Sequence, residues 1–424
     1  MVEPLKIQFL SPFSVSAAVF CCLVCSGIVR PKNRHPYQSA VPLGKAESVS
    51  GTVCSNPAKT ASGKFYSAGL MLESAQGTVS GVPVVSSASG KIRVLIPSET
   101  VEALYPGKLF SSSQGAVLVE SGERLCLSGS WKEDAGFFMA DTAAQLEQLK
   151  SLSGRLCRFR ALCRLSFKRL MFGWGGAGGF ILALLSGSRE YTEPSVSEHF
   201  RKAGLSHVLA LSGMHLSFFA SLAGFAGNRF LGKRADFWLR LAGIVFFVWF
   251  AGLSPSLFRA LLCSLFMLVC GAVFCTRIDF FTVLCAVFLI HCAAFPEDMC
   301  SAAFILSYGA LAGILVFSGM IQSLLERFLP QKIASPLAAS AGAQIATAPV
   351  SASLFSAVTP IGIISSAAVS PLVSFFLLAS VVAIAVSFVI PCTAQAFGVM
   401  LNLLYAAIAK TVQFFALFPS VSFQ

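Results

Sequence analysis

The chain has 424 residues, of which 55% are hydrophobic and only 12% are charged, and its mean hydropathy is +0.76. Soluble domains carry roughly 25% charged residues, so this composition excludes an ordinary soluble enzyme. The formal net charge of +12 suits anionic partners, either lipid headgroups or nucleic acid, and does not choose between them.

The charged residues are concentrated in one part of the chain. Residues 31–169 hold 27 of the 50 charged residues, whereas the stretch from Ser335 to Gln424 contains only Lys410. This contrast predicts a polar domain joined to a membrane-embedded domain. The chain has no pair of CxxC motifs, no HExxH motif and no P-loop. We therefore expect no metal site, no cofactor and no catalytic residue.

The first apolar run extends from Ile7 to Val29, which is long enough to cross a bilayer, since ~20 residues span the hydrocarbon. We interpret residues 1–30 as a retained transmembrane helix. A cleaved signal peptide is the main alternative, and a lipid-modified Cys25 is a lesser one.

From about residue 45 to residue 135 the hydrophobic period changes to two, most clearly in Lys91–Pro97. Five or so short strands over ~80 residues predict a small all-β soluble domain, either a barrel or a sandwich. The domain contains two cysteines: Cys54 follows its first predicted strand, and Cys126 lies in its last. In a closed barrel they could pair as a disulfide if the domain faces an oxidising compartment, and two unpaired buried thiols are the alternative.

Residues 150–170 read as a basic amphipathic helix. Apolar residues such as Leu152, Leu156 and Phe159 fall on one narrow arc, with basic residues around the rest. We predict an interfacial helix that binds anionic lipid, with a DNA-phosphate surface as the sharper alternative. The basic residues expected to bind are Arg155, Arg158, Arg160, Arg164, Lys168 and Arg169.

Residues 171–424 read as a polytopic helical domain. Apolar segments lie at roughly 171–187, 206–225, 237–253, 256–275, 278–295, 300–321, 336–357, 361–390 and 396–418. With the first helix, about nine to eleven membrane elements are expected. The 361–390 segment is long for one helix, and we expect Pro371 to divide it into a re-entrant half and a spanning half. The glycine-rich stretch at 173–179 is expected to permit close helix packing.

The densest set of polar residues in an apolar region runs from His199 to His215. Ser212 and Gly213 are expected to loosen a helix there, which would expose backbone groups to a water-filled path. His207 and His215 flank this point, and two histidines hydrogen-bonded between helices are the plainer alternative. A hydrolase that uses Ser212 and His215 is disfavoured, because the sequence has no GxSxG elbow and no acidic residue in this helix.

This segment resembles a known signature. Ala203–His215 is similar to the G-x-x-H-L-L-A-I-S-G-L-H motif of the ComEC competence-protein family. Three further blocks follow in the family's order, namely Ser254–Ala260, Ala303–Tyr308 and Gln344–Pro349, and Pro371 matches a later element. The resemblance covers most of residues 45–390.

The resemblance implies a channel that carries transforming single-stranded DNA across the bacterial inner (plasma) membrane, with an OB-like domain outside the cytoplasm. Basic residues after the first helix argue for the opposite orientation. The implied path residues are His207, Ser212, Gly213, His215, Arg259, Ser307 and Gln344. For Arg259, snorkelling to the interface is an equal alternative. For Ser307 and Gln344 the alternative is helix–helix hydrogen bonding, which is favoured for Ser307.

The implied partners are single-stranded DNA, membrane lipids, a separate motor ATPase and DNA-receptor proteins, and the oligomeric state stays open, a homo-oligomer included. Two family positions differ, with Ile305 in place of a glutamine and Ser366 in place of an asparagine. Many members continue into a metallo-β-lactamase-like domain, whose His-x-His-x-Asp-His segment this sequence lacks, so we expect a short form without nuclease. A transporter of another anionic polymer or lipid is the alternative function.

Overall fold

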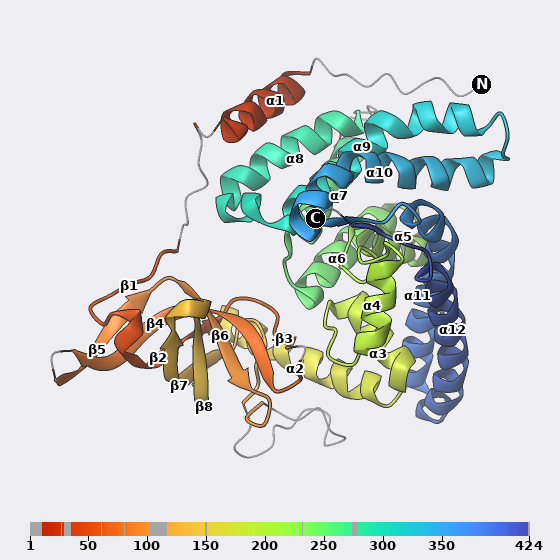
Figure 1. The fold of residues 1–424 in the computed structure, drawn as a ribbon. Coiled ribbons are helices and arrows are strands. Elements are labelled where there is room, and N and C mark those ends of the chain that lie inside the picture. Colours follow the sequence, from red (N-terminus) through yellow and green to blue (C-terminus); the bar gives the residue numbers. More distant parts are fainter. Residues whose placement is uncertain are drawn as a thin grey trace. The chain divides into compact units, whose positions relative to one another are not determined.

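The structure, a computed structural model, describes residues 11–26, 28, 35–60, 62–79, 81–101, 117–148, 151–230, 232–273 and 279–422. The chain forms two compact units, each described here by itself (Figure 1). The membrane unit contains the first helix, Ser195–Pro391 and the chain from Leu403 onward. The barrel unit contains residues 33–194 together with Cys392–Asn402.

The barrel unit is built from strands in which buried and exposed residues alternate, as in β6, where Ile92, Val94 and Ile96 are buried. This period-two pattern places one side of each strand in a core. The strands are β1 (Gln38–Ser39), β2 (Ala46–Val53), β3 (Ala58–Lys59), β4 (Phe65–Val79), β5 (Val82–Ser89), β6 (Lys91–Pro97), β7 (Arg124–Lys132) and β8 (Phe137–Gln145).

Five of these strands close into a barrel. The pairing runs β4–β2–β7–β8–β6 and returns to β4, and the β6–β8 pair is parallel while the other pairs are antiparallel. A five-stranded Greek-key barrel of this kind is the OB-type architecture, so the predicted β domain is confirmed. The predicted boundary at residue 135 omits β8, because the strand opens with three large apolar residues in a row, Phe137, Phe138 and Met139, which hide the alternation of the sequence.

The predicted pairing of Cys54 with Cys126 does not fit this barrel. Their strands are neighbours, as expected, but Cys126 lies opposite Ser50, four residues before Cys54. At ~3.3 Å per residue this offset separates the two cysteines by about 13 Å along the strands, whereas a disulfide needs Cα atoms within about 7 Å. Instead, Cys126 Sγ lies 3.5 Å from Ser48 Oγ.

The helices begin at residues that suit their first turns. Ser151, Asp279 and Ser301 precede α2, α8 and α9, and each side chain accepts a backbone N–H bond from the residue three positions later. The helices are α1 (Pro12–Cys25), α2 (Leu152–Phe172), α3 (Gly175–Ser186), α4 (Pro194–Lys202), α5 (Gly213–Phe230), α6 (Lys233–Ala251), α7 (Pro255–Val273), α8 (Phe280–Ala294), α9 (Ala302–Leu325), α10 (Gln331–Phe355), α11 (Gly362–Val389) and α12 (Ala394–Phe415).

Small residues allow close approach between these helices. In the α9–α10 pair (Figure 1), a Cβ atom on Gly313 would lie 2.3 Å from the carbonyl oxygen of Gly342. In the glycine-rich stretch before and within α3, a Cβ on Gly178 would lie 1.8 Å from the carbonyl oxygen of Met171. Both contacts need glycine, as expected where backbones pack directly together.

Three helical stretches in the described part of the chain are long and apolar enough to cross a membrane, namely Ala302–Leu325, Gly362–Val389 and Pro391–Phe415. Shorter apolar helices occur at Pro12–Val24, Gly175–Ser186, Pro255–Cys270 and Phe280–Ala294. A β-rich N-terminal region followed by a helical part with candidate spans agrees with the predicted fold class. The count of nine to eleven membrane elements stays a prediction.

Two predicted segments differ from the structure. Pro371 does not divide its segment, because α11 runs without a break from Gly362 to Val389. Proline removes one hydrogen bond, and helices among other helices tolerate that loss. The segment predicted as a helix over 206–225 becomes helical only at Gly213, so its first residues are not helical.

Candidate functional site

The signature segment 203–212 forms a non-helical connection between α4 and α5 in the membrane unit. Gly204 begins it with a φ of +73°, a conformation that side-chain-bearing residues rarely adopt. The connection ends at Ser212, and α5 starts at Gly213. The loosening expected at Ser212 and Gly213 therefore takes the form of a helix start. This brings the positive end of a helix to the signature motif.

His215 lies in the first turn of α5 and is fully buried. Its Nδ1 is 3.2 Å from both the backbone nitrogen and the Oγ of Ser212. Because the backbone N–H donates to Nδ1, the neutral ring carries its proton on Nε2. Nε2 is buried and has no hydrogen-bond partner among the described residues. Triad chemistry requires a carboxylate that orients the histidine, and no carboxylate of the described residues contacts His215.

Arg259, near the start of α7, extends over the first turn of α5. Its Nη2 would lie 3.9 Å from a Cβ atom on Gly213, and its Nη1 donates to the carbonyl oxygen of Ser307. No carboxylate pairs with Arg259 in the described structure, and its Nε is buried without a partner. The neighbouring Ser256 fastens α7 to the same segment by donating to the Leu211 carbonyl at 2.8 Å. We call Ser212, Gly213, His215, Arg259 and Ser307 the Arg259 cluster.

A polar chain continues from the Arg259 cluster between α8 and α9. The guanidinium carbon of Arg259 is 5.9 Å from the centre of the Tyr308 ring. The Tyr308 hydroxyl is 3.2 Å from Nδ1 of the fully buried His291, whose Nε2 is 3.2 Å from Oδ2 of Asp298. This chain fixes the ring against which the guanidinium lies.

A second meeting point of the motifs surrounds Gly204. A Cβ atom on Gly204 would lie 2.9 Å from the Cα of Gly362, at the start of α11. Ser365 donates to the Ala203 carbonyl at 2.7 Å, and Gln344 Nε2 donates to the Thr359 carbonyl at 3.2 Å. We call this set the Gly204 contact. It joins the first and fourth motif blocks to α11.

The structure thus brings together five of the seven predicted path residues, those of the Arg259 cluster. Gln344 lies in the Gly204 contact, and His207 is exposed, with no described contact to His215 or Arg259. Tyr308, His291 and Asp298 were missed as site residues. His291 had a signal, since an ionisable residue within an apolar helix marks a functional candidate.

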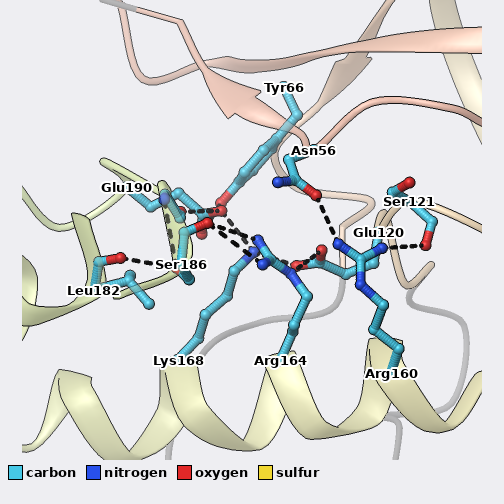
Figure 2. Close-up of polar contacts among 11 residues, drawn as sticks. Asn56, Tyr66, Glu120, Ser121, Arg160, Arg164, Lys168, Leu182, Ser186 and Glu190 are labelled. Atoms are coloured by element: carbon cyan, nitrogen blue, oxygen red, sulfur yellow. Dashed lines mark hydrogen bonds and ion pairs between the residues drawn. The ribbon is translucent and has the colours of Figure 1, made fainter. Parts of the chain in front are cut away.

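The basic helix α2 lies differently from the prediction. Figure 2 shows Arg160, Arg164 and Lys168 on the same side of α2, with Arg164 and Lys168 reaching Glu120 and Glu190. Arg160 donates to Asn56 and to the Ser121 carbonyl. These three cations and Arg169 are buried, so the expected surface role of four of the six basic residues is corrected. Arg158 pairs with Glu123 at 3.0 Å, and Arg155 is exposed. Arg164 and Lys168 face inward because they pair with the buried carboxylates of the barrel unit, which are costly to bury without a cation. The exposed arc of α2 is apolar and contains Leu152, Leu156 and Phe159.

The buried charges of Figure 2 form a closely paired set, which we call the charge cluster. Glu120 contacts Arg164 Nε at 2.8 Å and Lys168 Nζ at 2.6 Å, and Glu190 contacts the same Nζ at 2.7 Å. Burial alone would raise the pKa of Glu120, but the two cations outweigh it and lower that pKa to about 2. Burial and Glu190 together raise the pKa of Tyr66. The cluster therefore holds the barrel, α2 and the segment after α3 together as ionised pairs.

The part of the chain that contains the Arg259 cluster and the Gly204 contact is similar to a known protein family. The family model described as "Competence protein" matches residues 184–424, which is more than half of the chain. The chain belongs to the Competence protein family. The match contains every residue of the Arg259 cluster and of the Gly204 contact, whereas the barrel and α2 lie before it.

A curated relative supports the family. Over 145 residues the chain is 27% identical to ComE operon protein 3 of Bacillus subtilis (strain 168). The aligned part is 34% of this chain and 19% of that protein, so the chain spans about a fifth of the length of this Competence-family relative. No solved structure matches the chain.

Proposed function

We propose that this Competence-family protein carries single-stranded DNA across the bacterial inner membrane during DNA uptake. Competence is the capacity of a cell to take up DNA, and membership of the family supports a role in that process. The three candidate spans support a multi-pass membrane protein. Because the sequence has no P-loop, the energy for transport would come from a separate motor ATPase.

The observation that carries the proposal is the unpaired positive charge of Arg259. Arg259 is half-buried, its Nε is fully buried, and charges taken out of water are ordinarily paired or neutralised. In the described chain this guanidinium has only the Ser307 carbonyl and the Tyr308 ring as partners. It lies where three motif blocks meet, beside a non-helical segment of the membrane unit. Non-helical backbone at membrane depth is tolerated where it lines a water-filled cavity, and a nucleic-acid strand needs such a path with a positive potential.

The barrel gives secondary support. The second and third strands of an OB barrel form its usual oligonucleotide face, and these are β4 and β6 here. Lys91 and Arg93 are exposed on β6, opposite Met71 and Gly69 of β4. Two exposed cations on the same face of β6 give this surface a positive charge that suits a phosphate backbone.

The test is DNA uptake in a strain that lacks its own competence membrane protein and is complemented with this chain. We expect uptake to be restored by the wild type and abolished by His215→Ala or Gly213→Leu, with membrane levels of the protein near normal. As the control, Arg327→Gln removes an exposed charge beyond the end of α9 and should leave uptake intact.

The outcomes separate the candidate functions. No restored uptake by a well-expressed wild-type chain would contradict the proposal and favour a transporter of another anionic polymer or lipid. Loss of the protein itself in the two variants would show that these positions serve packing, since overfilling a tight contact costs about 1–3 kcal/mol.

A further inference from the structure

The first turn of α5 gathers hydrogen-bond donors that the described structure leaves without acceptors. Gly213 and Met214 open the helix, so their backbone N–H groups have no acceptor within it. The His215 ring folds back over this turn through its contact with Ser212, and its Nε2 is fully buried and unpaired. Buried donors without acceptors are rare in folded proteins.

A cation lies at the same place. Arg259 places Nη2 within 3.9 Å of the Cβ position of Gly213, and its buried Nε is also unpaired. The N-terminus of a helix carries partial positive charge, so a guanidinium there repels it unless an anion lies between them. No carboxylate among the described residues supplies that anion.

Gly213 brings the backbone of this turn close to α7. A Cβ atom there would lie 3.4 Å from the Cβ of Ala260, on the side that faces Arg259. Without a side chain at this position, an anion can approach both the backbone N–H groups and the guanidinium. Ser307 and Tyr308 hold the guanidinium from its other side.

We propose that the first turn of α5, His215 Nε2 and Arg259 together bind a phosphodiester group. A phosphodiester carries one negative charge and several acceptor oxygens, which matches a planar guanidinium fork and a set of backbone N–H groups. This assignment rests on the proposed function, in which the site binds one phosphate of the DNA strand as the strand passes. A lipid headgroup offers the same chemistry, and the experiment distinguishes the two sources.

The full chain is reconstituted in phosphatidylcholine nanodiscs, and binding of a short oligothymidylate is measured at several salt concentrations. We expect Arg259→Gln to weaken binding about tenfold or more and to lower the slope of log K against log salt by ~0.7, the value for one phosphate contact. Arg259→Lys keeps the charge but loses the fork, so it should keep the slope and lose part of the affinity. A matched oligomer with neutral methylphosphonate linkages should bind weakly and show no dependence on residue 259.

Arg327→Gln is the matched control, because it removes one charge from the same unit beyond the end of α9, about 27 Å along that helix from Ser307. Equal affinity and slope for wild type and Arg259→Gln would overturn the phosphodiester site while leaving DNA binding intact. No oligonucleotide binding, but stabilisation by added phosphatidylglycerol that Arg259→Gln removes, would support the site and contradict the DNA function. Absence of both effects would overturn both.

Discussion

Replacing Glu120 by alanine is expected to lower the free energy of unfolding of the barrel unit by about 3–5 kcal/mol. The Glu120 carboxylate is 1% exposed and pairs with both Arg164 and Lys168. Its removal leaves two buried cations beside one described carboxylate, that of Glu190, and a buried charge without a partner is costly. The measurement is the thermal midpoint of the purified full chain in detergent, followed by protease resistance of the barrel.

Glu198→Ala is the matched control. Glu198 also pairs with two cations, Arg201 and Lys202, but its side chain is 42% exposed, and ion pairs exposed to water contribute little to stability. If Glu120→Ala and Glu198→Ala gave equal small shifts, the charge cluster would not stabilise the barrel unit.

The effect of Glu120 has a defined pH window. Its pKa in the folded chain is about 2, below the ordinary value of 4.5. A group whose pKa is lowered by folding contributes stability above its unfolded pKa and loses it as the pH falls through the folded value. The difference between wild type and Glu120→Ala should therefore be full at neutral pH and shrink between about pH 4.5 and pH 2.

Replacing Gly204 by valine is expected to disrupt the membrane unit and abolish function. A left-handed φ of +73° costs a branched residue about 1–2 kcal/mol. In addition, its Cβ would approach the Cα of Gly362 to 2.9 Å, a backbone atom that has no flexible way to move aside. Overpacking of this kind costs a further ~1–3 kcal/mol. The amount of folded protein in membranes and DNA uptake measure the result.

Gly136→Val separates strain from packing. Gly136 has a left-handed φ of +64°, but a Cβ atom there meets nothing within 4 Å. It should therefore show the strain cost alone, with folded protein and uptake largely kept. Equal losses for the two valine variants would mean that the Gly204 contact does not hold the motif blocks together.

Much of this architecture follows from local sequence. Alternation in Lys91–Pro97 and the apolar arc of residues 150–170 identify a strand and a helix, because each pattern repeats with the period of its own backbone. β8 was missed where Phe137, Phe138 and Met139 follow one another without alternation, and the interruption of helix was placed near Ser212 but not extended back to Gly204. Both errors lie where local signals are weak.

The partners of polar residues could not be read from the sequence. The amphipathic pattern of α2 separates its cations from Leu152 and Phe159. It cannot show that Arg164 pairs with Glu120, which lies 44 residues earlier in the chain. Likewise Arg259 meets Ser307 only because α7 packs beside α9, 48 residues later. The motif blocks predicted seven path residues, and the structure brings five of them together in the Arg259 cluster. Their role in a DNA path stays a prediction.

We infer that the non-helical segment 203–212 and the Arg259 cluster line the path of the strand. The most direct measurement places a photo-crosslinking amino acid at the exposed Ala210 and stalls an incoming labelled strand with a bulky tag on its trailing end. The matched position is Phe388 in α11, which is 88% exposed. If this segment lines the path, we expect DNA crosslinks at position 210 and none at position 388. No crosslink at position 210 while the strand is stalled, or equal crosslinks at both positions, would contradict it.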